Sequence, residues 1–318
     1  MNPDVVEAIG RLRREGILTD AQAAPLERAA RGDVVSAEAE LRTVLYGGVA
    51  LIMAGVGLFL KENHERLGPV AIGTLLAVVA AACLWYAWRR LPPFSWSESS
   101  AGHLGADYVL LLGVLLIGAD LGYLEVELHL LGARWAYHLL LGAAIALVLA
   151  YRFDSRSVLS LALTSFAAWR GVAVSVSFAR SASAIPAVRA NALACGALFV
   201  AAGIASVRTR RKPHFERVYT RLGLILFFGG LLTGVFRDRD WGFWELPLFV
   251  AAAIVIATAY RLRRPLDFSI GVLAAYLGLL RILFHWMLDA GGFLVVAASS
   301  AAVVVLLVRA QRRMREAR

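Results

Sequence analysis

Cysteine is scarce in this chain, which contains only Cys83 and Cys195. Both lie inside apolar runs, near opposite ends of the helices that these runs predict, so their sulfur atoms are not expected to meet. We therefore exclude a disulfide-stabilised fold and interpret both cysteines as small core residues. Proline is similarly restricted. All nine prolines fall in predicted links, in the N-terminal segment or in first turns, so no predicted helix is broken by proline.

The usual sequence motifs of enzymes and metal sites are absent. The chain has no Gly-x-Ser-x-Gly nucleophile elbow, no glycine-rich phosphate loop, no His-Glu-x-x-His pair and no paired cysteine motif. We therefore predict no catalytic residue, no metal site and no cofactor. An unfamiliar enzyme acting within the membrane stays open as a third alternative to the two functions weighed below.

Charged residues make up only 18% of the chain, hydrophobic residues make up 59%, and the mean hydropathy is +0.67. This composition excludes a soluble globular protein. Apolar runs recur with close to the roughly 20 residues that a helix needs to cross about 30 Å of hydrocarbon. They span 43–60, 69–88, 107–124, 135–151, 157–178, 190–207, 218–236, 244–260, 266–288 and 292–308.

These runs predict an all-α fold, a polytopic transmembrane helical bundle of about ten helices built from repeated hairpins. The bundle is expected to cover residues 43–308. Residues 1–42 are polar and helix-forming and predict a short cytosolic helical leader, and residues 309–318 predict a basic cytosolic tail. Because a charged segment precedes the first apolar run, we expect no cleavable signal peptide.

The hairpin repeat is best seen between Asp107 and Arg152, where an acidic, His-containing link joins two apolar runs. The stretch from Trp241 to Arg261 overlays its second half, with a tryptophan and a Tyr-Arg pair in corresponding positions. Gly118-xxx-Gly122 and Gly230-xxx-Gly234 also correspond, and small residues at this spacing predict close helix packing. A true repeat is favoured, although the interfacial preference of aromatic residues and arginine explains part of the correspondence.

The net charge of +10 has a simpler explanation than nucleic-acid binding. Most of the 33 lysine and arginine residues lie in the leader, the tail and the even-numbered links, as the positive-inside rule requires of cytoplasmic segments. We therefore predict that both termini are cytoplasmic, that the lipid bilayer is the main partner and that no nucleic acid is bound. The cluster of Arg208, Arg210, Arg211 and Lys212 is expected to lie at anionic lipid headgroups.

Three segments carry a resemblance to a known family: GILTDAQ at 16–22, GVGLFLKENHERLGP at 55–69 and IGADLGYLEVELHLLGARW at 117–135. Their order resembles the uncharacterised bacterial membrane-protein family called domain of unknown function 2157. The chain departs from that pattern at Asn63-His64, where an Asn-Trp pair is expected, and near His129, where a Gln-containing motif is expected. The resemblance covers roughly the first half of the chain. It implies a multi-pass protein of the bacterial cytoplasmic (inner) membrane and supplies no activity.

Three ionisable residues, Asp120, Arg170 and Arg281, lie inside the apolar runs, where an unpaired charge costs several kcal/mol. Each lies on the order of 20 Å along its helix from the predicted cytoplasmic end, which places all three in the outer half of the bilayer. We hypothesise that Asp120 pairs with Arg170 or Arg281 in one polar layer. Alternatively, each arginine extends to the outer interface and Asp120 ends its helix. A substrate or proton pathway is the more specific interpretation.

A second set of polar residues, Glu125, Glu127, His129 and His138, lies on the predicted outer side. Glu125 and His129 are four residues apart, so one helical turn places them on one face, as a metal site could use. Ordinary solvated link residues explain this weak pattern better, and we predict no metal there. We treat the four residues as a candidate outer-face polar cluster.

Two functions fit these observations. A transporter or permease-like protein is supported by the polar layer and the repeat, although the repeats run in one orientation and no helix is broken by proline. The alternative is a non-transporting membrane scaffold or sensor, in which residues 1–42 bind a cytosolic protein partner or self-associate. The sequence alone does not decide between them.

Overall fold

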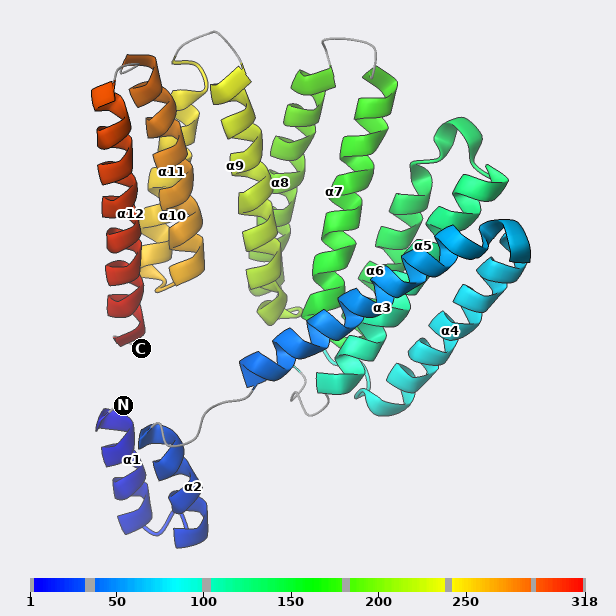
Figure 1. Ribbon diagram of the computed structural model, residues 1–318. Helices are drawn as coiled ribbons and strands as arrows, with labels where there is room; N and C mark the ends of the chain where they lie inside the picture. The colour runs from blue at the N-terminus through cyan, green and yellow to red at the C-terminus, as the bar shows by residue number, and fades with distance from the viewer. Residues whose placement is uncertain are drawn as a thin grey trace. The chain divides into compact units, whose positions relative to one another are not determined.

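The computed structural model describes residues 3–31, 38–98, 104–178, 184–237, 242–286 and 290–316. The α-helices are α1 (Pro3–Arg14), α2 (Asp20–Arg31), α3 (Glu38–Leu67), α4 (Pro69–Arg90), α5 (Leu104–Leu128), α6 (Tyr137–Phe153), α7 (Arg156–Phe178), α8 (Ala184–Arg208), α9 (Glu216–Arg237), α10 (Glu245–Arg261), α11 (Pro265–Trp286) and α12 (Ala290–Glu316). Two short 3-10 turns, η1 (Gly132–Arg134) and η2 (Pro213–Phe215), complete the elements. These ranges contain no β-strand, so the predicted all-α class is confirmed (Figure 1).

Seven of the described helices are long and apolar enough to cross a membrane, namely α3, α4, α5, α8, α9, α11 and α12. Helix α6 is a shorter apolar helix. The described part has twelve α-helices, more than the ten predicted for the bundle, because α1 and α2 belong to the leader. The polytopic helical bundle is therefore confirmed.

The chain forms two compact units, Met1–Leu58 and Phe59–Arg318. Their boundary lies inside α3, beyond the predicted end of the leader at residue 42. In the first unit α1 and α2 pack against each other. Gly16 has a positive φ of 71° in the turn between them, where glycine carries no steric cost.

Thr19 and Gln22 fix the start of helix α2. The backbone N–H and the hydroxyl of Thr19 both donate to the Gln22 side-chain oxygen, at 3.1 and 3.0 Å, and the Thr19 carbonyl accepts from the backbone N–H of Gln22 and of Ala23. These bonds satisfy backbone donors that a helix start leaves free. Arg13 then forms an ion pair with Asp20 at 2.6 Å across the turn. The leader is thus a short helical hairpin, as its sequence predicts.

In the second unit the helices pack most extensively as the pairs α4 with α5, α6 with α7, α8 with α9, and α10 with α11. The sequence repeat had instead paired α5 with α6 and α9 with α10, and these neighbours contact each other less. The all-α bundle is as predicted, but the most extensive helix contacts join pairs other than the predicted hairpins.

Glycine explains the closest of these pairs. A side-chain carbon on Gly196 of α8 would lie 2.7 Å from the Gly223 carbonyl oxygen of α9, and one on Gly223 would lie 2.8 Å from the Gly196 oxygen. The two helix backbones therefore touch at this point, as small residues in membrane helices allow. Large side chains at either glycine would force α8 and α9 apart.

The predicted close-packing glycines have mixed outcomes. Gly230 approaches Leu193 of α8, and Gly234 lies under Trp244, whose ring a side-chain carbon would meet at 2.5 Å. Gly118 has no neighbour within 4 Å in the described structure, and Gly122 meets only His138 at 4.0 Å. Close packing is therefore confirmed for the second motif and wrong for Gly118, which lies on an exposed face of α5.

Candidate functional site

The predicted polar layer places Asp120 on α5, Arg170 on α7 and Arg281 on α11. Asp120 lies toward Gly73 of α4, on which a side-chain carbon would be 3.2 Å from Oδ1. This Oδ1 atom is buried and has no hydrogen-bond partner among the described residues. Within that part of the chain no ion pair within 4.0 Å joins Asp120 to either arginine.

Arg170 has other partners. Its Nη2 atom donates to the Asn191 side-chain oxygen of α8 at 2.9 Å, and its guanidinium lies 5.6 Å from the ring centre of Trp169. Arg281 is partly buried on α11. The structure therefore brings Arg170 together with Asn191, a residue that the charge-based sequence analysis did not consider because an amide carries no charge.

Two further buried polar atoms lie in the same helices without a partner in the described structure: the Tyr123 hydroxyl of α5 and Nε1 of Trp169 on α7. Tyr123 follows Asp120 by three residues, so both lie on one side of α5. Buried polar groups in native proteins nearly always have a partner, whether a protein atom or an ordered water. These atoms are the features of this region that call for a functional explanation.

The candidate outer-face polar cluster separates into different roles. Glu125 is buried, and its carboxylate accepts from the backbone N–H of Leu131 at 3.0 Å, which holds the chain just after α5. His129 is exposed with a positive φ of 50°, and Glu127 is exposed. His138 approaches the Trp135 carbonyl through Nδ1 at 2.5 Å and stacks on the Trp135 ring. Among the residues described, no group of three or more His, Cys, Asp or Glu could hold a metal ion.

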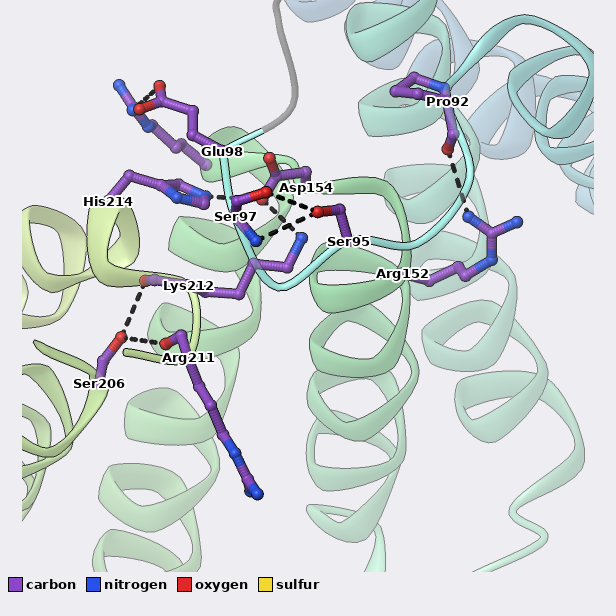
Figure 2. Close-up of polar contacts among 11 residues, drawn as sticks. Pro92, Ser95, Ser97, Glu98, Arg152, Asp154, Ser206, Arg211, Lys212 and His214 are labelled. Carbon is purple, nitrogen blue, oxygen red and sulfur yellow. Dashed lines mark hydrogen bonds and ion pairs between the residues drawn. The ribbon is translucent and has the colours of Figure 1, made fainter. Parts of the chain in front are cut away.

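A different polar site lies where four links of the second unit come together. We call this region the basic end, and it comprises the links between α4 and α5, α6 and α7, α8 and α9, and α10 and α11. Asp154 at the end of α6 accepts from Lys212 Nζ at 2.7 Å and from His214 Nε2 at 2.6 Å, both through Oδ1. Figure 2 shows the Lys212 and His214 side chains, which come from one link, pointing toward Asp154 of another. The exposed fractions of the Lys212 and Asp154 side chains are 0% and 7%.

Local sequence explains the position of Asp154. It ends α6 in the left-handed conformation, with a φ of 61°, and its backbone N–H donates to the Ala150 carbonyl. The next residue, Ser155, caps α7 because its hydroxyl oxygen accepts from the Val158 backbone N–H at 3.2 Å. Asparagine and aspartate tolerate the left-handed region better than most residues. A two-residue turn thus aims the Asp154 carboxylate into the basic end.

Lys212 is held from several sides. Its backbone N–H donates to the Trp96 carbonyl at 3.0 Å, and Nζ lies 5.3 Å from the ring centre of Phe94 and 5.7 Å from that of Phe215. Aromatic faces attract a cation, and the carboxylate neutralises it. The Lys212 carbonyl accepts from the Ser206 hydroxyl at 2.8 Å. A buried ammonium would cost several kcal/mol without this shell of partners.

The imidazole of His214 completes the site. A carboxylate oxygen can only accept, so the proton shared with Asp154 is carried by Nε2. Nδ1 of His214 is buried and has no hydrogen-bond partner in the described residues, and the ring packs edge-on against Phe215. We call Asp154, Lys212 and His214 the clamp. Together with the Trp96 carbonyl, which accepts from Lys212, these residues join three links.

Other side chains extend the same network. Arg152 donates to the Pro92 carbonyl at 3.4 Å and lies over the Trp88 ring, while Arg156 pairs with Glu98 at the surface. Beside the clamp, Arg264 of the link before α11 pairs with Glu216 at the start of α9. The basic end therefore carries side-chain contacts among all four of its links.

Sequence reasoning missed this clamp and misplaced Lys212, which was expected at the lipid headgroups. That expectation is wrong for Lys212, because the side chain is fully buried. Residue type alone would not have found it, because the chain's other lysine, Lys61, is exposed.

Residues 10–159 match the family model described as Predicted membrane protein (DUF2157). The resemblance stated from the sequence is therefore confirmed for the part of the chain from α1 to the start of α7. Asp120 and Asp154 lie inside the matched region, whereas Lys212 and His214 lie outside it. No curated protein and no solved structure matches the chain. The family match and the seven candidate spans identify an integral, multi-pass membrane protein.

Proposed function

We propose that this integral membrane protein is a transporter in which Asp120 binds a proton or a polar solute during transport. The observation that carries the proposal is the buried Oδ1 atom of Asp120, which has no hydrogen-bond partner among the described residues. An ionisable side chain inside a membrane helix is costly, and such residues mark ion, proton or substrate pathways.

The neighbourhood of Asp120 supports this proposal. The Tyr123 hydroxyl lies one turn further along α5 and also lacks a partner in the described structure. Gly73 of α4 packs closely against this part of α5, because a side-chain carbon there would lie 2.8 Å from Leu124 Cδ2 and 3.2 Å from Asp120 Oδ1. Polar atoms of this kind are satisfied by an ordered water or by a polar solute. Transport without a proline-broken helix would require α4 and α5 to move as rigid bodies.

The membrane and the orientation are part of the proposal. The protein resides in the bacterial cytoplasmic membrane, with both termini and the basic end in the cytoplasm. The excess of lysine and arginine in the links of the basic end supports this orientation.

Proton flux into proteoliposomes tests the role of Asp120. The full-length protein is reconstituted with a pH-sensitive dye inside the vesicles, and a potassium diffusion potential is imposed. We expect the wild-type protein to admit protons faster than empty liposomes do. Asp120→Asn should lower the flux to the level of empty liposomes, because the amide cannot release a proton.

The matched control is Glu127→Gln on the same helix, which removes a carboxylate from an exposed position. It should leave the flux unchanged. A wild-type protein that admits no more protons than empty liposomes, or an Asp120→Asn protein as active as the wild type, would contradict proton transport through Asp120.

A scaffold or sensor is the second candidate function, and the leader favours it. The leader helices belong to a compact unit separate from the rest of the bundle. They leave apolar side chains exposed, with Ile17 64%, Leu26 45% and Leu12 37% exposed. Exposed apolar side chains on a small element are candidates for a binding surface. In this role the leader either self-associates or binds a cytosolic protein.

Energy transfer between labelled copies of the full-length protein in liposomes tests self-association through the leader. Ile17→Asp should reduce the transfer, because it places a charge on the exposed apolar surface. Glu15→Gln, an exposed change in the same hairpin, should leave the transfer unchanged. Equal transfer in wild type and Ile17→Asp would exclude self-association through this surface and leave a cytosolic partner as the ligand of the leader.

A further inference from the structure

A cleft of about 280 Å³ opens at the basic end, apart from Asp120 and from the clamp at Asp154. It lies between the start of α9, the start of α11 and the end of α12. Its lining residues are Arg217, Arg221, Arg264, Pro265, Leu266, Asp267, Gln311 and Met314. Gln311 donates to the Ser269 hydroxyl at 2.9 Å, and this contact holds the end of α12 against α11.

Two of the three arginines are oriented by buried carboxylates. Arg221 Nε lies 3.5 Å from Asp267 Oδ1, and Arg264 Nη1 lies 3.9 Å from Asp267 Oδ2. Arg264 also pairs with Glu216, and the side chains of Glu216 and Asp267 are only 10% and 6% exposed. The guanidinium groups of Arg221 and Arg264 are therefore held in place before any ligand arrives.

The third arginine remains available to a ligand. Arg217 is exposed and makes no hydrogen bond or ion pair with the residues that the structure describes. Nε of Arg221 and Oδ1 of Asp267 are buried and form no hydrogen bond in the same part of the chain. The lining contains three arginines and one carboxylate, and Glu216 outside the lining pairs with Arg264, so a net positive charge remains at the cleft.

We propose that this cleft binds a phosphate group, carried either by the headgroup of an anionic lipid or by a small soluble phosphate ester. The planar guanidinium offers paired N–H donors that match phosphate oxygens, and arginine is preferred for such recognition. The volume fits a phosphate with a small substituent and is at the lower end of ordinary ligand sites. Basic pockets between membrane helices suit lipid headgroups, and this cleft lies where the helices end.

Calorimetric titration of the full-length protein in a non-ionic detergent tests the proposal. One arm uses glycerol 3-phosphate as the soluble ester, and a second uses short-chain phosphatidylglycerol as the anionic lipid. Short-chain phosphatidylcholine, which carries no net charge, is the third arm. We expect the protein to bind phosphatidylglycerol or glycerol 3-phosphate in preference to phosphatidylcholine, and the tighter of the two identifies the source of the phosphate.

Arg217→Gln is the diagnostic variant, because it removes a cation that holds no carboxylate in the described structure and so should not disturb folding. It should weaken binding about tenfold, as expected for the loss of one charge-assisted hydrogen bond. The control is Arg210→Gln, an exposed arginine of the same end outside the cleft. It should leave the affinity unchanged.

Two results would overturn the proposal. One is that neither glycerol 3-phosphate nor phosphatidylglycerol binds. The other is an equal loss of affinity in Arg217→Gln and Arg210→Gln, since this would show attraction by the overall positive charge of the surface. Neither result depends on proton flux, so the cleft is tested independently of the transport proposed for Asp120.

Discussion

The ammonium group of Lys212 lies within 6 Å of two aromatic ring centres while it donates to Asp154. A guanidinium is larger and planar, and it would not fit this position in the same way. The contribution of such a pair is best judged by what happens when one partner is lost. Replacing one member of a buried ion pair leaves the other charge buried without a partner. This lowers the free energy of unfolding more than replacing both members by apolar residues does.

Asp154→Asn is therefore expected to lower the free energy of unfolding by about 3 kcal/mol, because the Lys212 ammonium stays buried without its carboxylate. Adding Lys212→Met to Asp154→Asn should recover part of this loss. The measurement is thermal unfolding in detergent, followed by intrinsic fluorescence. Glu98→Gln is the control, since its pair with Arg156 is exposed and should be worth less than about 1 kcal/mol. A double variant less stable than the single one would contradict the assignment.

Individual helices were predictable because each follows from a local run of apolar residues. The run at 157–178 became α7 (Arg156–Phe178), and the run at 218–236 lies within α9 (Glu216–Arg237). Which helices pack tightly together was not predictable in the same way, because it depends on facing glycines such as Gly196 and Gly223. The clamp was missed for a similar reason. Asp154 and Lys212 are 58 residues apart, and no periodicity relates them.

At this scale the contact between α8 and α9 makes a direct prediction. Gly223→Ala should lower the free energy of unfolding by roughly 1–3 kcal/mol, because the added carbon would meet backbone atoms of α8 at 2.8 and 2.9 Å. Gly229→Ala on the same helix meets nothing within 4 Å and should leave stability unchanged or slightly raised. The comparison is again made by thermal unfolding in detergent. Equal stability of the two variants would show that α8 and α9 can separate freely.

For the whole molecule, the uneven distribution of positive charge predicts one orientation in the membrane. The basic end collects arginines from several links, and the opposite end carries Glu125 and Glu127. Chains orient so that lysine- and arginine-rich links stay in the cytoplasm. The sequence was sufficient for this prediction, because charge counts in links do not depend on how the helices pack.

Labelling of introduced cysteines checks the orientation. In a variant with Cys83 and Cys195 replaced by serine, Glu127→Cys should react with a membrane-impermeant maleimide in spheroplasts. Arg210→Cys should react only after the membrane is opened. Both positions are exposed in the structure, so accessibility depends on the side of the membrane. Labelling of Arg210→Cys in intact spheroplasts would reverse the proposed orientation.

The clamp also imposes an order on biogenesis. Trp96 and Asp154 leave the ribosome before Lys212, so the growing chain exposes a carboxylate and a free backbone carbonyl that find their partner only later. The links between α4 and α5 and between α6 and α7 also contact each other directly, through Arg152 with Pro92 and Arg156 with Glu98. Completion of the link between α8 and α9 then adds Lys212, which joins both earlier links to the third.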